Sequence, residues 1–199
     1  MDFDNHFKLW VNYNGVILNL KNAIEIYMEN FPEDPTYRSS YINYDLGLYA
    51  IHISFLYTGY MNAPFEKMMQ FKTAEERKYV WDQLVERINP SYFNGTVTDP
   101  DNDFILVTNP KISNPDIAVR IINTTYINAI YMDPVKDGDS LEIEVCFTFV
   151  NGKGLVVPID YDKDKYETIE KQMEAINWST LHVMLGYPDI IKDLKPKSN

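Results

Sequence analysis

The sequence Leu141-Glu-Ile-Glu-Val-Cys-Phe-Thr-Phe-Val150 decides the fold class, because hydrophobic and polar residues alternate along it. A period of two is typical of a β-strand with one buried face. The alternation predicts that five side chains face the core: Leu141, Ile143, Val145, Phe147 and Phe149. It predicts that the intervening side chains face outward: Glu142, Glu144, Cys146 and Thr148. The turn Asn151-Gly-Lys-Gly154 then leads into a second strand at 155–159.

Further strands are expected on both sides of this segment. Asn14-Gly15 favours a type I′ turn and predicts a hairpin over residues 7–18. Residues 41–57 are largely hydrophobic on both faces of an alternating pattern, which indicates a central strand. Shorter strands are predicted at four other places: residues 65–71, 104–108, 117–122 and 126–132.

The strongest helix signal lies in the middle of the chain. Thr73-Ala-Glu-Glu76 has the pattern of a capping box, in which the threonine hydroxyl and the glutamate carboxylate satisfy backbone N–H groups at the start of a helix. A hydrophobic stripe that includes Trp81 and Leu84 follows, and Asn89-Pro90 ends it, so a helix is predicted at 74–88. Helical spacing of hydrophobic residues predicts others at about 20–30, 163–177 and 178–186.

Together these elements predict an α+β fold with mostly antiparallel sheet and three to four short helices. No Pro-rich or Ser-rich linker divides the chain, so we expect one domain over residues 1–194 and a disordered tail at 195–199. A hairpin followed by a helix is predicted at both 7–30 and 141–177, which suggests a weak duplication of a ββα unit.

Composition predicts a cytoplasmic protein. The chain has 199 residues, lacks the pattern of a secretory signal, and has a single cysteine, Cys146, which excludes an intramolecular disulfide. No hydrophobic run approaches the ~20 residues that a membrane-spanning helix needs. Abundant Asn, Ile, Tyr and Lys indicate an AT-rich gene, such as that of a low-GC bacterium, a phage or a plasmid.

The acidic residues are unevenly distributed. The formal net charge is −11, and residues 99–144 contain nine acidic residues but only three basic ones. Such a field repels phosphate groups and anionic lipids and attracts cationic partners, so we expect no direct binding to nucleic acid or membrane. Acidity that serves only solubility is the alternative. The candidate binding residues are Asp99, Asp101, Asp103, Asp133, Asp137, Asp139, Glu142 and Glu144.

Aromatic residues near predicted turns are a second set of candidates. Tyrosine is frequent at protein interfaces, because it offers a large contact area with little loss of side-chain entropy. The alternative is that these side chains cover the edges of a sheet. The candidates are Tyr57, Tyr60, Tyr92 and Phe93.

Signals for a metal or a catalytic group are incomplete. The Asp-x-Asp-x-Asp spacing occurs at 99–103 and at 160–164, but neither segment has the glycine and glutamate of an EF-hand loop. A looser site could use Asp160, Asp162 and Asp164. The histidines at 6, 52 and 182 are isolated in the sequence, and acidic neighbours would raise the pKa of the Cys146 thiol. We therefore predict no cofactor.

These patterns favour a non-catalytic protein that binds a basic or nucleic-acid-handling protein and inhibits it. An immunity protein or a phage inhibitor of a defence enzyme would fit. One alternative is a hydrolase with a dispersed Asp/Glu site that uses a divalent cation. The other is a structural or assembly protein of a phage or plasmid. The sequence makes no prediction of oligomeric state.

Overall fold

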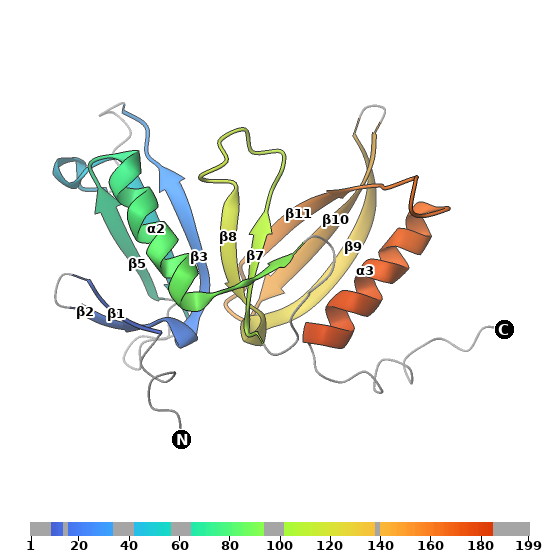
Figure 1. Cartoon of the computed structure of the whole chain (residues 1–199), viewed down its shortest axis with the longest axis horizontal. Helices are drawn as coiled ribbons and strands as arrows, with labels where there is room; N and C mark the ends of the chain where they lie inside the picture. Colours follow the sequence, from blue (N-terminus) through green and yellow to red (C-terminus); the bar gives the residue numbers. More distant parts are fainter. Residues whose placement is uncertain are drawn as a thin grey trace, which may run out of the picture.

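A computed structural model describes residues 9–13, 16–33, 42–56, 65–93, 102–137 and 140–184. Within these ranges it shows an α+β fold, as predicted, in which two sheets and a small hairpin are accompanied by two α-helices (Figure 1). Three short 3-10 turns also occur: η1 (Leu20–Asn22), η2 (Tyr44–Leu46) and η3 (Thr124–Tyr126). Neither α-helix is long and apolar enough, within these ranges, to cross a membrane.

The larger sheet has six strands in the order β5-β4-β3-β8-β7-β6. Neighbouring strands are antiparallel except β6 and β7, which are parallel. The prediction of a central strand within 41–57 is confirmed for Tyr49–Phe55, which form β4 between β3 and β5, whereas Tyr44–Leu46 form η2 instead. The strands are β3 (Ala23–Asn30), β4 (Tyr49–Phe55), β5 (Phe65–Phe71), β6 (Ser91–Phe93), β7 (Phe104–Thr108) and β8 (Val119–Asn123).

Helix α2 (Ala74–Ile88) has the predicted bounds and covers one face of this sheet (Figure 1). The Thr73 hydroxyl accepts a hydrogen bond from the Glu76 N–H at 3.1 Å, and the Glu76 carboxylate accepts one from the Lys72 N–H at 3.1 Å. Asn89 ends the helix in the left-handed conformation, with φ 51°. These caps satisfy backbone groups that a helix end would otherwise leave unpaired.

The N-terminal hairpin is also confirmed. Strands β1 (Trp10–Tyr13) and β2 (Val16–Asn19) are antiparallel, and Tyr13 pairs with Val16. That register leaves two residues for the turn, as a type I′ hairpin requires. The turn residues 14–15 themselves lie outside the described ranges.

The helix predicted at 20–30 is wrong. One 3-10 turn, η1, is followed by strand β3, which lies between β4 and β8. Most of β3 is buried on both faces, so its hydrophobic residues satisfy a helical spacing and a central-strand pattern equally well. Because no helix follows the first hairpin, the element order at 7–30 differs from that at 141–177, and the predicted ββα duplication is not observed.

The smaller sheet has the order β11-β10-β9, in which β9 is Ile127–Asp137, β10 is Ser140–Phe149 and β11 is Gly154–Asp160. The alternation predicted for β10 is confirmed for Ile143, Val145, Phe147 and Phe149, which are all buried. It is wrong at three other positions. Leu141 is 38% exposed, whereas Glu142 and Cys146 are each 6% exposed, because other parts of the chain cover part of the second face of this sheet.

The C-terminal region forms one helix, α3 (Ile169–Met184), and not the two predicted at 163–177 and 178–186. The Asp162 carboxylate accepts hydrogen bonds from the N–H groups of Asp164 and Lys165, so this segment forms a turn before the helix begins. Residues 185–199, which include the predicted disordered tail, lie outside the described ranges.

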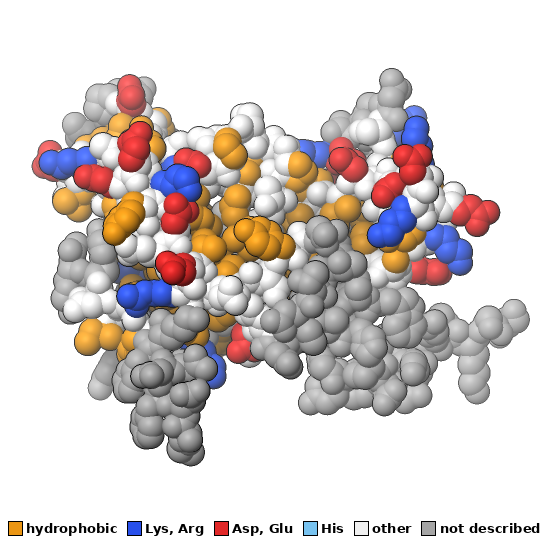
Figure 2. Space-filling model, viewed as in Figure 1, with side chains coloured by type: hydrophobic (Ala, Val, Ile, Leu, Met, Phe, Trp, Pro, Cys, Tyr) orange, Lys and Arg blue, Asp and Glu red, His pale blue; other side chains and the backbone are white. Residues whose placement is uncertain are grey.

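Two hydrophobic clusters occupy the two faces of the six-stranded sheet. The first includes Ile26, Ile53 and Ile121 with Trp81 and Leu84 of α2. The second joins the opposite face to the smaller sheet and α3; its members include Ile24, Ile105, Ile122, Val145, Phe147 and Ile176. Figure 2 shows charged side chains over the two helices and hydrophobic side chains between them. Because the second cluster has members in both sheets, the two sheets share a core.

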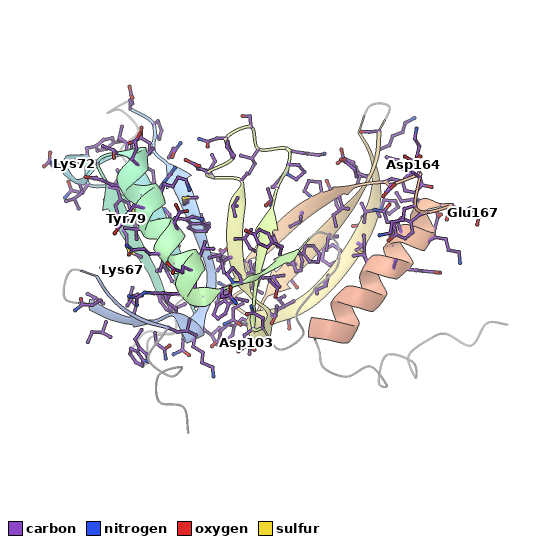
Figure 3. All side chains as sticks on the ribbon, in the orientation of Figure 1. Lys67, Lys72, Tyr79, Asp103, Asp164 and Glu167 are labelled. Carbon is purple, nitrogen blue, oxygen red and sulfur yellow. The ribbon has the colours of Figure 1, made fainter. Side chains whose placement is uncertain are left out.

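Trp81→Ala should lower the free energy of unfolding by about 3–5 kcal/mol, because it removes a buried aromatic side chain from the contact between α2 and the sheet. Tyr79 on the same helix points to solvent and is 67% exposed (Figure 3), so Tyr79→Ala is the matched control, with a change below about 0.5 kcal/mol. Urea unfolding followed by circular dichroism measures both. Equal losses would contradict this packing.

Candidate functional site

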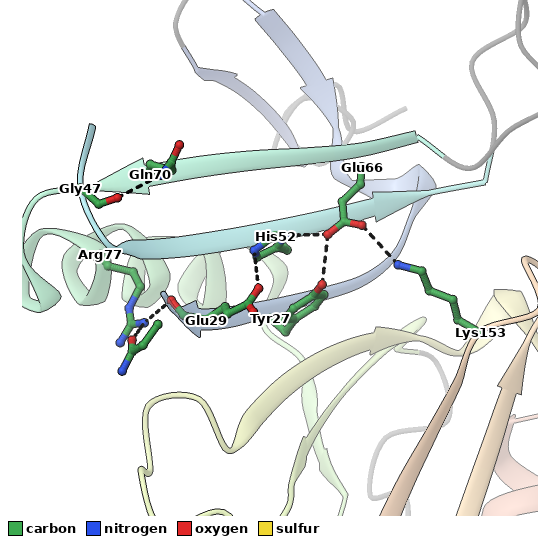
Figure 4. Close-up of polar contacts among 9 residues, drawn as sticks. Tyr27, Glu29, Gly47, His52, Glu66, Gln70, Arg77 and Lys153 are labelled. Atoms are coloured by element: carbon green, nitrogen blue, oxygen red, sulfur yellow. Dashed lines mark hydrogen bonds and ion pairs between the residues drawn. The ribbon is translucent and has the colours of Figure 1, made fainter. Parts of the chain in front are cut away.

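A histidine between two carboxylates lies on the face of the six-stranded sheet that α2 does not cover. Strand register places His52 of β4 directly beside Tyr27 of β3. The His52 Nε2 atom lies 2.9 Å from a carboxylate oxygen of Glu29, and its Nδ1 atom lies 2.6 Å from one of Glu66 (Figure 4). Strands β3, β4 and β5 each contribute one residue to this bridge. His52 is only 8% exposed.

Two other groups complete this cluster. The Tyr27 ring stacks on the His52 ring at 4.8 Å between centroids, and its hydroxyl donates to the Glu66 carboxylate at 3.0 Å. The Lys153 ammonium, from the turn between β10 and β11, lies 3.3 Å from the other Glu66 oxygen (Figure 4). Beside them the Arg120 guanidinium lies 4.5 Å above the Tyr27 ring. The cluster therefore ties the smaller sheet to the larger one.

The cluster shifts the ionisation of its members. Burial by itself would lower the pKa of His52, but the hydrogen bonds to Glu29 and Glu66 outweigh it and raise the pKa to about 9. The hydrogen bond from His52 lowers the pKa of Glu66 to about 2. Burial, together with the neighbouring Glu66 carboxylate, raises the pKa of the Tyr27 hydroxyl above its usual range. The raised pKa of His52 favours its imidazolium form at neutral pH, beside Glu29 and Glu66.

This arrangement is a cross-link between strands and not a catalytic base. An imidazolium has no lone pair with which to accept a proton, and its two ring nitrogens already lie within ion-pair distance of Glu29 and Glu66. The sequence analysis treated His52 as isolated, because its partners lie on other strands. The available signal was a histidine on one face of a predicted central strand, since a buried polar group there needs partners.

The free energy of unfolding should be highest between about pH 4.5 and pH 6.5. The raised pKa of His52 gives stabilisation that is complete below about pH 6.5 and is lost as the pH rises through about 9. The lowered pKa of Glu66 gives stabilisation that is complete above about pH 4.5 and is lost as the pH falls through about 2. His52→Gln should flatten the alkaline limb. Urea unfolding measures the profile, and a His52 NMR titration with a midpoint near 6.5 would contradict it.

The structure separates the predicted acidic binding residues. Asp103 and Asp133 are exposed and Glu144 is half-buried. Glu142 is wrongly predicted as part of an exposed surface, because it is buried and its carboxylate lies 2.8 Å from the Lys111 ammonium. Four others cannot be placed, because their side chains lie outside the described ranges: Asp99, Asp101, Asp137 and Asp139.

Of the predicted aromatic binding residues, one is exposed and another is buried in the core. Tyr92 is 68% exposed, as expected for a surface contact residue. Phe93 is a core residue instead: it is 7% exposed and packs edge-on against Phe147 of β10, with centroids 5.4 Å apart. Alternation along β6 turns these neighbours to opposite faces of the sheet. Tyr57 and Tyr60 lie outside the described ranges.

Of the aspartates in the first aspartate-rich segment the described ranges include only Asp103, which does not meet the second segment. Asp103 and Asp164 lie at well-separated positions in Figure 3, and Asp162 is engaged in the turn before α3, while Asp160 and Asp164 are exposed. Among the described residues no three His, Cys, Asp or Glu side chains are placed to hold a metal ion. Burial raises the pKa of the Cys146 thiol, and Asp133 and Glu144 act in the same direction.

A second candidate site, separate from the His52 cluster, lies on the side of the smaller sheet that faces away from α3. Asp133 of β9 and Glu144 of β10 are directly opposite each other, and in the next row Cys146 lies between Tyr131 and Val156. We call these five residues the outer acidic face. Tyr131 is 51% exposed and Val156 is 42% exposed. Within the described ranges neither carboxylate has a lysine or arginine within ion-pair distance.

Comparison of this chain with models of protein families, with curated proteins and with solved structures finds no match. The candidate function therefore depends on the geometry of the two sites.

Proposed function

We propose that this chain is a non-catalytic binding protein whose outer acidic face takes up a basic protein. The observation that carries the proposal is the direct opposition of Asp133 and Glu144 on an accessible part of the smaller sheet. Like charges directly across two antiparallel strands destabilise the sheet. A lysine or arginine from a partner, placed between the two carboxylates, would convert that repulsion into attraction.

The neighbours of these carboxylates support a protein partner. Tyr131 and Val156 present exposed hydrophobic surface in the row next to the charged pair. Protein interfaces commonly combine an aromatic anchor with polar groups around it. A metal ion or a free amine would use the carboxylates but would gain nothing from this hydrophobic surface.

The charge of the whole chain supports the same class of partner. A net charge of −11 speeds encounter with a cationic surface and disfavours binding to phosphate backbones. We propose that the partner is itself a nucleic-acid-handling protein, whose basic groove the outer acidic face occupies. An immunity protein or an anti-defence inhibitor acts in this way. A reduced cytoplasm suits the buried, unbridged Cys146 thiol.

The double variant Asp133→Asn/Glu144→Gln should lose partner binding and gain stability. Removing the repulsion should raise the free energy of unfolding by about 0.2–1 kcal/mol. Binding should weaken at least tenfold, because the partner's cation loses both carboxylates. Affinity capture from the native host, identification of the captured protein, and calorimetric titration at increasing salt measure the effect.

The matched control is Glu86→Gln/Glu167→Gln, which makes the same change in net charge at exposed positions on α2 and before α3. It should bind as the unmodified chain does. Equal weakening by both double variants would show that only net charge matters. Affinity that is independent of ionic strength would overturn the electrostatic proposal.

A further inference from the structure

Strand β9 is an edge of the smaller sheet, since the described residues place no strand on its other side. Backbone hydrogen bonds show whether the N–H and C=O groups of each β10 residue point toward β9 or toward β11. The Phe149 N–H donates to the Lys153 carbonyl, and the Leu141 carbonyl accepts from the Tyr161 N–H, so odd-numbered residues of β10 point toward β11. Even-numbered residues of β10 therefore point toward β9.

The same alternation shows which residues of β9 have backbone groups that point away from β10. Register pairs Cys146 with Tyr131 and Glu144 with Asp133, so these β9 residues bond to β10. Ile130, Met132 and Pro134 lie between and beyond them, and their backbone groups point away from the sheet. Pro134 has no N–H, so it interrupts the row of outward donors without removing a bond to β10. Among the described residues no hydrogen-bond partner is found for the outward N–H and C=O groups of Ile130 and Met132.

A cavity of about 370 Å³ runs beside this edge. Residues 130–132 form one wall, and Met173 of α3 is on the other. The side chains of Ile130, Met132 and Met173 are half-buried, whereas Glu170 and Glu174 are exposed. Glu174 has Lys171 at 3.6 Å, and for Glu170 no ion pair is found within the described ranges. The cavity is thus open, with hydrophobic side chains on both walls and carboxylates at its border.

We infer that the free edge of β9 binds an extended segment of the basic partner as an added strand. This inference rests on the proposed function and names how the partner is held. A strand added beside β9 sends alternate side chains to the two sides of the sheet. One set enters the cavity next to Met132 and Met173, and the other set lies beside Tyr131 and Asp133.

The cavity on one side of the sheet and the outer acidic face on the other determine which residue types the bound segment should have. The cavity side takes hydrophobic residues, and the side of the outer acidic face takes lysine or arginine, by charge complementarity with Asp133 and Glu144. The segment should therefore alternate hydrophobic and basic residues. Backbone hydrogen bonds to Ile130 and Met132 supply the register, and Pro134 interrupts the row of donors at that end.

An acetylated and amidated eight-residue peptide that alternates valine and lysine is the probe. On binding, amide hydrogen exchange should slow at Ile130 and Met132, whose N–H groups become hydrogen-bonded, and should change little at Tyr131 and Asp133, which already bond to β10. The same peptide with N-methylated valines, which keeps the charge but cannot complete the ladder, should bind at least tenfold more weakly. NMR titration measures both.

Met132→Pro should weaken binding of the probe about tenfold, because it removes an outward donor and leaves the bonds to β10 intact, as Pro134 already does. Lys136→Pro is the matched control, because it makes the same change farther along the same edge, away from the cavity, and should bind normally. Circular dichroism confirms that both variants fold. Met132→Ala, which keeps the donor, should bind more tightly than Met132→Pro.

The remaining outcomes are each decisive. Slow exchange at Ile130 and Met132 before any peptide is added would show that the edge is already covered, and would overturn the inference. Absence of binding, or binding without protection of these two amides, would overturn it as well. The partner could still be captured by Met132→Pro but not by Asp133→Asn/Glu144→Gln. That result would overturn the inference of an added strand and would still support the proposed function.

Discussion

The order of the central strands depends on how the acidic side chains of strand β3 are paired with basic side chains on its two neighbours. The strand lies between β4 and β8, and its residues 23–26 and Met28 are buried. It nevertheless carries the buried Glu25, which is 4% exposed, and the half-exposed Glu29. A buried carboxylate without a partner costs several kcal/mol. Glu25 is paired with Arg120 of β8 at 3.1 Å, and Glu29 with His52 of β4 at 2.9 Å. These pairs favour one order of the three central strands.

The same principle joins the two sheets. Lys153 reaches Glu66 from the turn after β10, and Lys111 reaches Glu142 from the loop after β7. Between these ion pairs the shared hydrophobic cluster holds the smaller sheet against the larger one. The smaller sheet is thus fixed in position, while its outer acidic face and the β9 edge keep accessible groups. The β9 edge lies directly beside Tyr131 and Asp133 of the outer acidic face, so a single extended segment could use both proposed contacts together.

Much of the candidate site could not be predicted, because its residues meet only through strand pairing. Asp133 and Glu144 were both candidates from charge alone, but nothing in the sequence indicates that they lie opposite each other. His52 and Glu66 are 14 positions apart and become neighbours through the pairing of β4 with β5. Register is a property of the assembled sheet, and a shift of one residue would turn these side chains to opposite faces.

The sequence by itself determined the features that arise from neighbouring residues: the capped helix α2, the pairing of β1 with β2, and the alternation of Ile143, Val145, Phe147 and Phe149. Caps, turns and alternation depend on backbone geometry within a few residues. Only the tertiary structure decided that residues 23–30 form a strand and that Glu142 and Phe93 are buried. Burial depends on what other segments cover, and a segment buried on every side satisfies both periodicities until its neighbours select one.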